Sequence, residues 1–442
     1  MRVKFYALAL FTSFLLCLQP VSAATLEALA RQAATADTAR AHAAVTELRA
    51  QGPAGLDALL RAYAADIQRH LDAETVLLSN PNDAAWLRIA NALDGVAQQK
   101  DSYAAGLYWY TDLKEAQKVA AKTGKPILSL RLLGRLTDEF SCANSRFFRA
   151  ALYSNAQVSQ YLREHFVLHW SSERPVPRVT IDFGDGRKIE RTITGNSIHY
   201  VLDAQGRPVD ALPGLYGPPA FLRALQEAEK IARQLAGQSD DARAVLLTNY
   251  HQTRLKTLND AWAADLARAG VAIARPNGDE AQPSAPVAAR AAPLAVTKRA
   301  VEMPLVSEIN PDPLNLNTIT DEAAWQKLAA LHASDAELDA HSHALMAQHL
   351  PPLLVNRKLS PMGRLYVMVQ NFQTLIALDT VRNEYLLHPR LHAWLAGDAT
   401  LSWEDMNRRV YDELFLTPST DAWLGLSGPD TYTGLAHGGV TP

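Results

Sequence analysis

Hydrophobic and polar residues follow several different periods along this chain, and the periods predict the order of its elements. Between residues 24 and 105 apolar side chains, many of them alanine, recur every three or four positions, which indicates helices. The predicted helices cover 25–48, 55–71 and 82–98, and breaks at Gly52-Pro53 and Asn80-Pro81 separate them. We expect this segment to be a helical packing or partner-binding region.

From residue 106 to residue 236 the period changes repeatedly, which is typical of a small α/β sandwich. Strands are predicted at 126–133, 166–170, 198–202 and 208–212, and helices at 111–122, 142–152, 156–165 and 218–234. Two further alternating runs, 178–183 and 187–193, flank Gly184-Asp185-Gly186 and predict a β-hairpin.

The rest of the sequence is helical in pattern, with one interruption rich in alanine and proline. A long apolar-periodic segment covers 361–387. The expected organisation is a signal peptide (1–23), a helical segment (24–105), an α/β domain (106–236), a helical extension (237–270), an Ala/Pro-rich linker (271–305) and a C-terminal helical domain (306–442).

The first residues have the three parts of a secretory signal peptide. Arg2 and Lys4 give a basic start, residues 7–18 form an apolar core, and Val21-Ser22-Ala23 is a small-residue cleavage site. The mature chain is expected to begin near Ala24 and to be periplasmic or secreted, with an uncleaved membrane anchor as the alternative. No later stretch approaches the roughly 20 apolar residues of a membrane span, so none is expected after cleavage.

Charge and cysteine content narrow the possible functions. Loss of the two basic residues of the signal changes 43 basic residues to 41 against 46 acidic ones, and the net charge from −3 to −5. This mild acidity excludes the basic surface that a nucleic-acid partner requires. Of the two cysteines, Cys17 lies in the signal peptide, so the mature chain has Cys142 alone and forms no internal disulfide.

Cys142 follows the strand-like run 126–133 and opens a predicted helix. The positive end of the helix dipole favours a thiolate at this position, and Arg131, Arg135 and Arg146 are close in sequence. Ser145 stands three residues later, so the motif is Cys-x-x-Ser.

Residues 108–235 resemble the thioredoxin-like superfamily. The resemblance is carried by Asp112-Leu113 with Thr123-Gly124-Lys125-Pro126-Ile127-Leu128, by Asn155-Ala-Gln-Val158 with Phe166-Val167, and by the stretch from Gly195 to Val209. It implies a thioredoxin-like α/β fold in an exported, bacterial-type protein, with Cys142 at the position of the family's nucleophilic cysteine. It covers less than a third of the chain.

Three departures from the family pattern oppose dithiol oxidoreductase activity. Ser145 replaces the resolving cysteine, Ser197 replaces the proline that the family holds in cis, and the loop 134–141 is long. The hypothesis that remains is monothiol disulfide exchange. Its site would be Cys142, Ser145 and Ser197, and its partner a protein or small thiol in the cell envelope. The alternative is a non-catalytic scaffold for protein binding, in which Cys142 is a small buried hydrophobe.

A second candidate site lies in the C-terminal region. Glu384, His388 and His392 are spaced four residues apart, which places them on one helix face and suits a transition metal; no other cofactor is expected. Asp379 and Glu413 are possible further ligands, and Pro389 is expected to end or kink the helix. The alternative is that the histidines cap helices or pair with carboxylates in a helical bundle.

Overall fold

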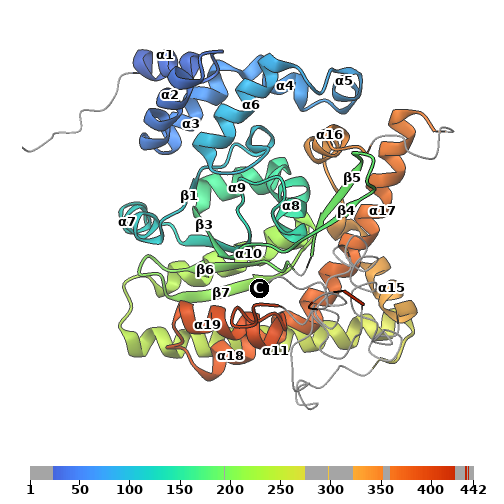
Figure 1. Ribbon diagram of the computed structural model, residues 1–442. Helices are drawn as coiled ribbons and strands as arrows, with labels where there is room; N and C mark the ends of the chain where they lie inside the picture. Colours follow the sequence, from blue (N-terminus) through green and yellow to red (C-terminus); the bar gives the residue numbers. More distant parts are fainter. Residues whose placement is uncertain are drawn as a thin grey trace, which may run out of the picture.

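The computed structural model describes residues 23–193, 195–273, 297, 322–351, 359–423, 434, 435 and 437. Within these ranges the protein is mixed α/β and mostly helical, built around a five-stranded sheet. N-terminal helices cover one side of the sheet region, and long C-terminal helices cover the other (Figure 1). All but the last residue of the expected signal peptide, and most of the expected Ala/Pro-rich linker, lie outside the described residues.

Short helices form the N-terminal layer: α1 (Ala23–Ala33), α2 (Thr38–Ala50), α3 (Pro53–Ala62), α4 (Ala64–His70), α5 (Ala73–Leu78) and α6 (Ala84–Ala97). Asp37, Asp72 and Asp83 cap α2, α5 and α6 by accepting hydrogen bonds from backbone N–H groups of the first turn. The layer has its own apolar core, which includes Leu48 and Leu93. Two of the predicted helices, 25–48 and 55–71, are each divided in two.

The sheet has the strand order β1-β3-β2-β6-β7. Its strands are β1 (Trp109–Tyr110), β2 (Ile127–Leu133), β3 (Val167–Arg174), β6 (Ile198–Leu202) and β7 (Pro208–Pro213). β1, β3 and β2 are parallel, and β6 and β7 are antiparallel to their neighbours. In the central strand β2 every residue except Arg131 is buried, which explains why only Ser129 and Arg131 interrupt its apolar sequence.

Helices accompany these strands: α7 (Leu113–Thr123), α8 (Ala143–Phe147), α9 (Ala156–His165) and α10 (Pro218–Leu235). Asp112 caps α7, and Gly124 ends it in the left-handed conformation (φ 72°) that glycine adopts without strain. A π-helical segment, Phe148–Tyr153, continues α8. The predicted strands and helices of this unit are confirmed, whereas the short strand β1 was not predicted.

The C-terminal part contributes α11 (Asp240–Ala269), α15 (Glu322–Leu331), α16 (Ala340–Gln348), α17 (Pro361–Arg382), α18 (His388–Gly397) and α19 (Trp403–Arg409). Leu391 of α18 and Tyr411 belong to the same apolar core as Leu130 of the sheet. Contact is very close at Gly217, where a Cβ would lie 1.8 Å from the carbonyl oxygen of Asp335. These helices therefore pack directly on the α/β unit.

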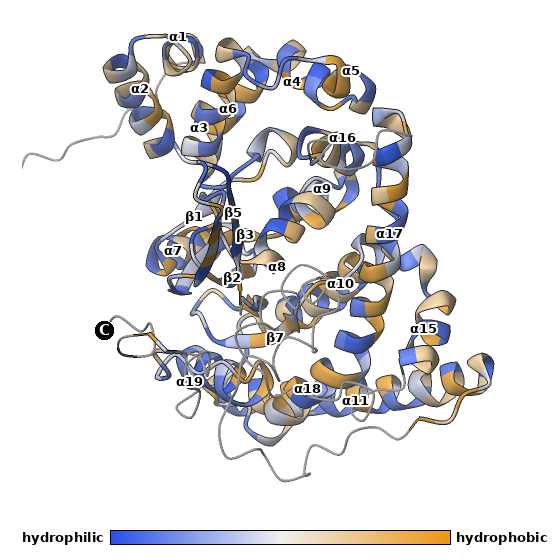
Figure 2. Ribbon diagram, turned by 45° about the vertical axis from the view of Figure 1, so that its right-hand side comes forward, coloured by the Kyte–Doolittle hydropathy of each residue, from blue (hydrophilic) through white to orange (hydrophobic). Residues whose placement is uncertain are grey.

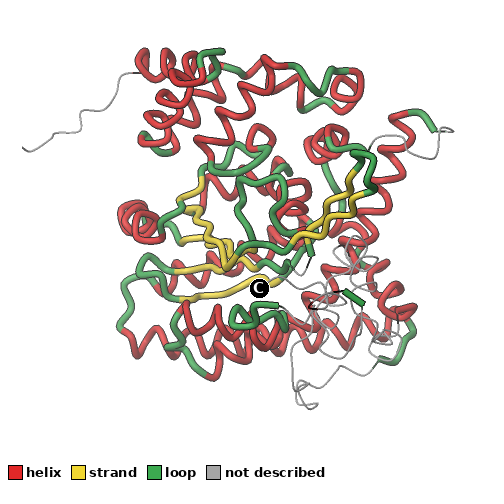
Figure 3. The backbone as a smooth tube through the Cα atoms, viewed as in Figure 1, coloured by secondary structure: helices red, strands yellow, loops and turns green. Residues whose placement is uncertain are grey.

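The predicted hairpin is confirmed as β4 (Arg178–Asp182) and β5 (Lys188–Thr192), with Ile181 opposite Ile189. It forms a separate two-stranded sheet that projects toward α16 and α17 (Figure 3). Its residues are mostly exposed, and β5 is strongly hydrophilic (Figure 2). None of the described helices has both the length and the hydrophobicity that a bilayer-spanning segment requires.

Candidate functional site

Cys142 lies immediately before α8, at the end of the loop that follows β2. Its backbone N–H donates to the carbonyl oxygen of Leu133 (3.1 Å), and its side chain is fully buried. Gly195 closes over it, because a Cβ at Gly195 would lie only 2.1 Å from the Cβ of Cys142. A disulfide of another molecule therefore reaches this sulfur only if the segment before β6 moves.

The structure brings the three predicted residues of the thiol site together. The Sγ of Cys142 lies 3.0 Å from the Oγ of Ser197 and 3.4 Å from the Oγ of Ser145. Ser145 also lies 2.8 Å from both the Oγ of Ser141 and the carbonyl oxygen of Cys142. The polar atoms of this cluster are thus paired with one another inside the protein.

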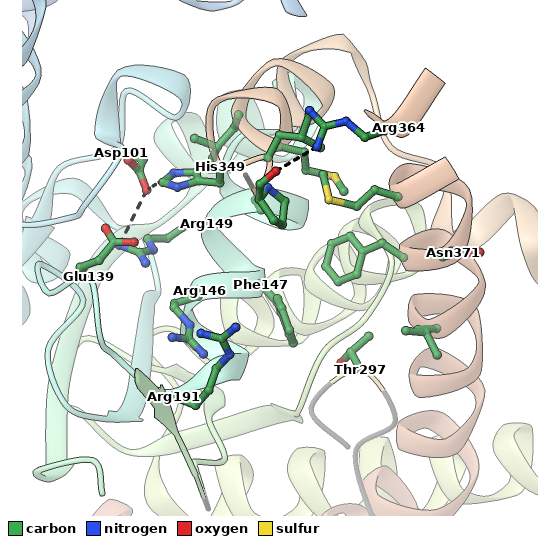
Figure 4. A pocket seen from close by; sticks show the side chains of 18 of the residues that line it. Asp101, Glu139, Arg146, Phe147, Arg149, Arg191, Thr297, His349, Arg364 and Asn371 are labelled. Carbon is green, nitrogen blue, oxygen red and sulfur yellow. Dashed lines mark hydrogen bonds and ion pairs between the residues drawn. The ribbon is translucent and has the colours of Figure 1, made fainter. Parts of the chain in front are cut away.

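Arg131 and Arg146, two of the arginines that were expected to favour a thiolate, lie against groups other than Cys142. The Nε of Arg131 donates to Glu173 (2.7 Å), and its guanidinium lies over the ring of Trp403. The side chain of Arg146 lines a cavity on the surface of α8 (Figure 4). Because a carboxylate compensates Arg131, this arginine adds little positive field at the sulfur.

His388 and His392 lie side by side on α18, with ring centroids 4.2 Å apart, and both are buried. Asp210 of β7 faces them: its Oδ1 lies 3.5 Å from the Nε2 of His388 and 3.8 Å from the Nδ1 of His392. Glu384 approaches the other nitrogen of His388 (3.7 Å). His251 of α11 completes the cluster, with its Nδ1 2.8 Å from the Nδ1 of His392.

These buried groups strongly influence one another's titration. Burial alone would raise the pKa of Asp210, but the neighbouring imidazoles outweigh burial and hold it well below its usual range. Burial would lower the pKa of His388, but Asp210 and Glu384 raise it to about 9. Burial lowers the pKa of His251 to about 4 and also depresses that of His392.

Sequence reasoning missed Asp210 and His251, which are distant in sequence from His388 and have no motif. Asp210 is the polar residue of the buried strand β7, and that is the only signal that could have identified it. The other expected oxygen ligands lie elsewhere: Asp379 accepts a hydrogen bond from the backbone N–H of Thr297 (3.0 Å), and Glu413 pairs with Arg409 (3.0 Å).

A cavity of about 900 Å³ lies against α8 (Figure 4). Its walls come from the loop before Cys142, α8, β5, the end of α16, and α17. Most of its lining is apolar and includes Phe147, Leu345, Met346, Met368, Phe372 and Leu375. Ligand pockets have this size and character.

Positive charge exceeds negative charge on the walls of this cavity. Its lining includes Arg146, Arg149, Arg191 and Arg364 against Asp101, Glu139 and Glu190. Asp101 is compensated by His349 (3.4 Å) and Arg149 (3.8 Å), which overcome the effect of burial and lower its pKa to about 2. Arg146 and Arg191 lie side by side at one end (Figure 4).

The two clusters and the cavity are distinct. The polar contacts of Cys142 are with serines, whereas those of His388 and His392 are with Asp210, Glu384 and His251. None of these residues lines the cavity. The chain matches no protein-family model, no curated protein and no solved structure.

Proposed function

We propose that this chain is an exported thioredoxin-like protein that binds a small amphipathic anion in the cavity beside α8, without turnover at Cys142. The observation that carries the proposal is the cavity itself, which combines an apolar lining with a pair of arginines at one end. An apolar chain would lie against Met368 and Phe372, and its anionic group would lie between Arg146 and Arg191.

The strand order supports the thioredoxin-like part of the proposal. β2 leads directly to Cys142, α9 leads into the parallel strand β3, and β6 and β7 form the antiparallel hairpin that closes the sheet. These are the positions that the sequence resemblance assigns to each element. The hairpin β4–β5 and the C-terminal helices are additions that build the cavity walls.

The environment of Cys142 favours binding over monothiol exchange. A nucleophilic thiol must reach the disulfide of its partner, whereas this sulfur is enclosed by Gly195 and bonded to buried serines. The chain therefore uses the fold as a scaffold, and Cys142 acts as one of its small buried residues.

The fluorescent fatty-acid analogue 11-(dansylamino)undecanoic acid tests the proposal. We expect saturable binding to the purified mature protein, and weaker binding of the methyl ester, which lacks the charge. Replacing Arg191 by Ala should weaken binding of the acid by roughly 10-fold or more, because a hydrogen bond to a charged group contributes about 1.5–3 kcal/mol.

Arg187→Ala is the matched control. Arg187 lies in the same hairpin, pairs with Asp185 (2.7 Å) and does not line the cavity. Equal affinity of the acid for R191A and R187A, or no binding to the unmodified protein, would contradict the proposal.

A further inference from the structure

We infer that Asp210, His388 and His392 form a binding site for a structural divalent transition-metal ion, with zinc as the best match. The inference is independent of the proposed ligand cavity, because the two sites have no residue in common. Two imidazoles and one carboxylate are a donor set that zinc accepts in proteins.

The distances between the donor atoms suit one ion. One donor atom from each of the three side chains lies within 4.8 Å of the other two, and the two shortest separations from Asp210 are 3.5 and 3.8 Å. Ligand bonds of about 2.0–2.1 Å in a tetrahedral site require separations of roughly 3.3 Å. A contraction of a few tenths of an ångström brings Asp210 to this separation from each histidine, and a water molecule would take the fourth position around the ion.

The orientation of the imidazoles also points to a ligand. Neither nitrogen of His388 has a hydrogen-bond partner, although both are buried; the Nε2 of His392 is in the same state. Buried nitrogens of this kind are normally bonded, and the Nε2 of His388 is aimed at Asp210, which indicates a ligand between these two side chains. The Nε2 of His388 faces the Oδ1 of Asp210.

Neighbouring groups hold the donor atoms in place, as around known metal sites. The hydroxyl of Tyr250 donates to the Oδ2 of Asp210 (2.6 Å), which leaves the Oδ1 turned toward the histidines. Glu384 lies 3.7 Å from the Nδ1 of His388, the arrangement of a carboxylate–histidine–metal triad. Glu384 thus acts on the metal through His388. His251 contacts the same nitrogen of His392 that faces Asp210, so the ion would take the place of this hydrogen bond.

The charges of the site match a divalent ion. Asp210 brings a carboxylate to a fully buried position, where an isolated charge is costly, and the partly exposed Glu384 brings a second one beside His388. A divalent ion bound by the deprotonated imidazoles would take over the pairing with both carboxylates. Arg254 lies at the outer side of Glu384, 4.0 Å away, and is partly exposed to solvent.

The position of the site indicates a structural role. Asp210 belongs to the edge strand of the sheet, the two histidines belong to α18, and the side chains of all three are at most 3% exposed. An ion here would tie the C-terminal helices to the sheet, and its burial excludes direct contact with a large substrate.

Metal content and a cobalt spectrum test the inference. The purified mature protein is treated with EDTA, reloaded with Zn²⁺, desalted and analysed; we expect about one equivalent of zinc and a rise in Tm of roughly 5 °C. Co²⁺ in place of zinc should give the intense visible absorption of a tetrahedral nitrogen–oxygen site. Retention of less than a tenth of an equivalent, with the spectrum of aqueous Co²⁺, would overturn the inference.

Variants locate the ion. Asp210→Asn keeps the shape of the side chain but removes its charge, and H392Q replaces the imidazole by a neutral amide. Each variant should lose the zinc and the rise in Tm that zinc causes. H169Q is the control, because His169 is also buried but pairs with Ser129 (2.8 Å) away from the site. Zinc that is retained equally by D210N, H392Q and H169Q would place the ion elsewhere and refute the site.

Discussion

Gly195 determines the state of the thiol of Cys142, because its lack of a side chain lets the backbone close over this residue. A methyl group at this position would overlap the Cβ of Cys142 at 2.1 Å. We therefore expect Gly195→Ala to lower the free energy of unfolding by about 1–3 kcal/mol, the usual cost of overpacking, and to expose the thiol. Urea denaturation and the rate of reaction with a disulfide reagent measure the two effects.

Gly397→Ala is the control for this substitution. Gly397 ends α18, and a Cβ there meets no atom within 4 Å, so the thiol should remain as slow to react as in the unmodified protein. Rapid reaction of Cys142 in the unmodified native protein would instead support monothiol chemistry.

At the scale of single residues, the sequence predicted part of each site. The spacing of Cys142 and Ser145, and the resemblance that aligned Ser197, correctly identified neighbours in space. Burial of the sulfur was not predictable, because it depends on Gly195, which is remote in sequence. Asp210 was missed for the same reason: a carboxylate in a strand has no partner in its own segment.

The helical elements show how a local irregularity positions side chains. Pro389 was expected to break the helix, and the chain accommodates it with a π-helical segment, Asn383–Leu387, before α18 begins at His388. The proline then occupies the first turn of α18, where its missing N–H has no cost. His388 and His392 consequently remain on one face, as the four-residue spacing predicted.

Another contact between elements should make stability depend on pH. His332, which follows α15, lies 2.6 Å from Asp265 of α11 and 3.2 Å from Asp335. Its hydrogen bond with Asp335 raises the pKa of His332. Partial burial lowers this pKa, but the contact with Asp265 raises it further, so the pKa stays above its usual value. A raised folded-state pKa stabilises the protein fully below the unfolded value of about 6.5, and this contribution is lost as the pH rises through the folded value.

The free energies of unfolding of the unmodified protein and His332→Gln should therefore differ by about 1 kcal/mol at pH 5.5 and by much less at pH 9. Urea denaturation at the two pH values measures this, and H42Q, at an exposed histidine of α2, provides the control. A difference that does not change with pH would show that His332 acts only through packing.

At the scale of the whole molecule, periodicity predicted the order of elements but not their partners. A period of 3.6 shows that a helix has an apolar face, and it contains no information about which surface covers that face. Leu391 of α18 and Leu130 of β2 lie 261 positions apart in sequence yet belong to one core. The hairpin β4–β5 was predicted, whereas the cavity that it forms with α17 depends on such long-range packing.

The division of the apolar residues into two cores leads to a prediction about cooperativity. α17 and α18 share their core with β2 and β6, whereas α1, α2 and α3 surround a separate core. In native-state hydrogen exchange, the most protected amides of α17 and α18 should therefore have the same free energy of opening as those of β2 and β6, with the same dependence on urea. The amides of α1–α3 should have a lower free energy of opening. Earlier, independent opening of α17 and α18 would instead identify a separate C-terminal domain that only rests on the sheet.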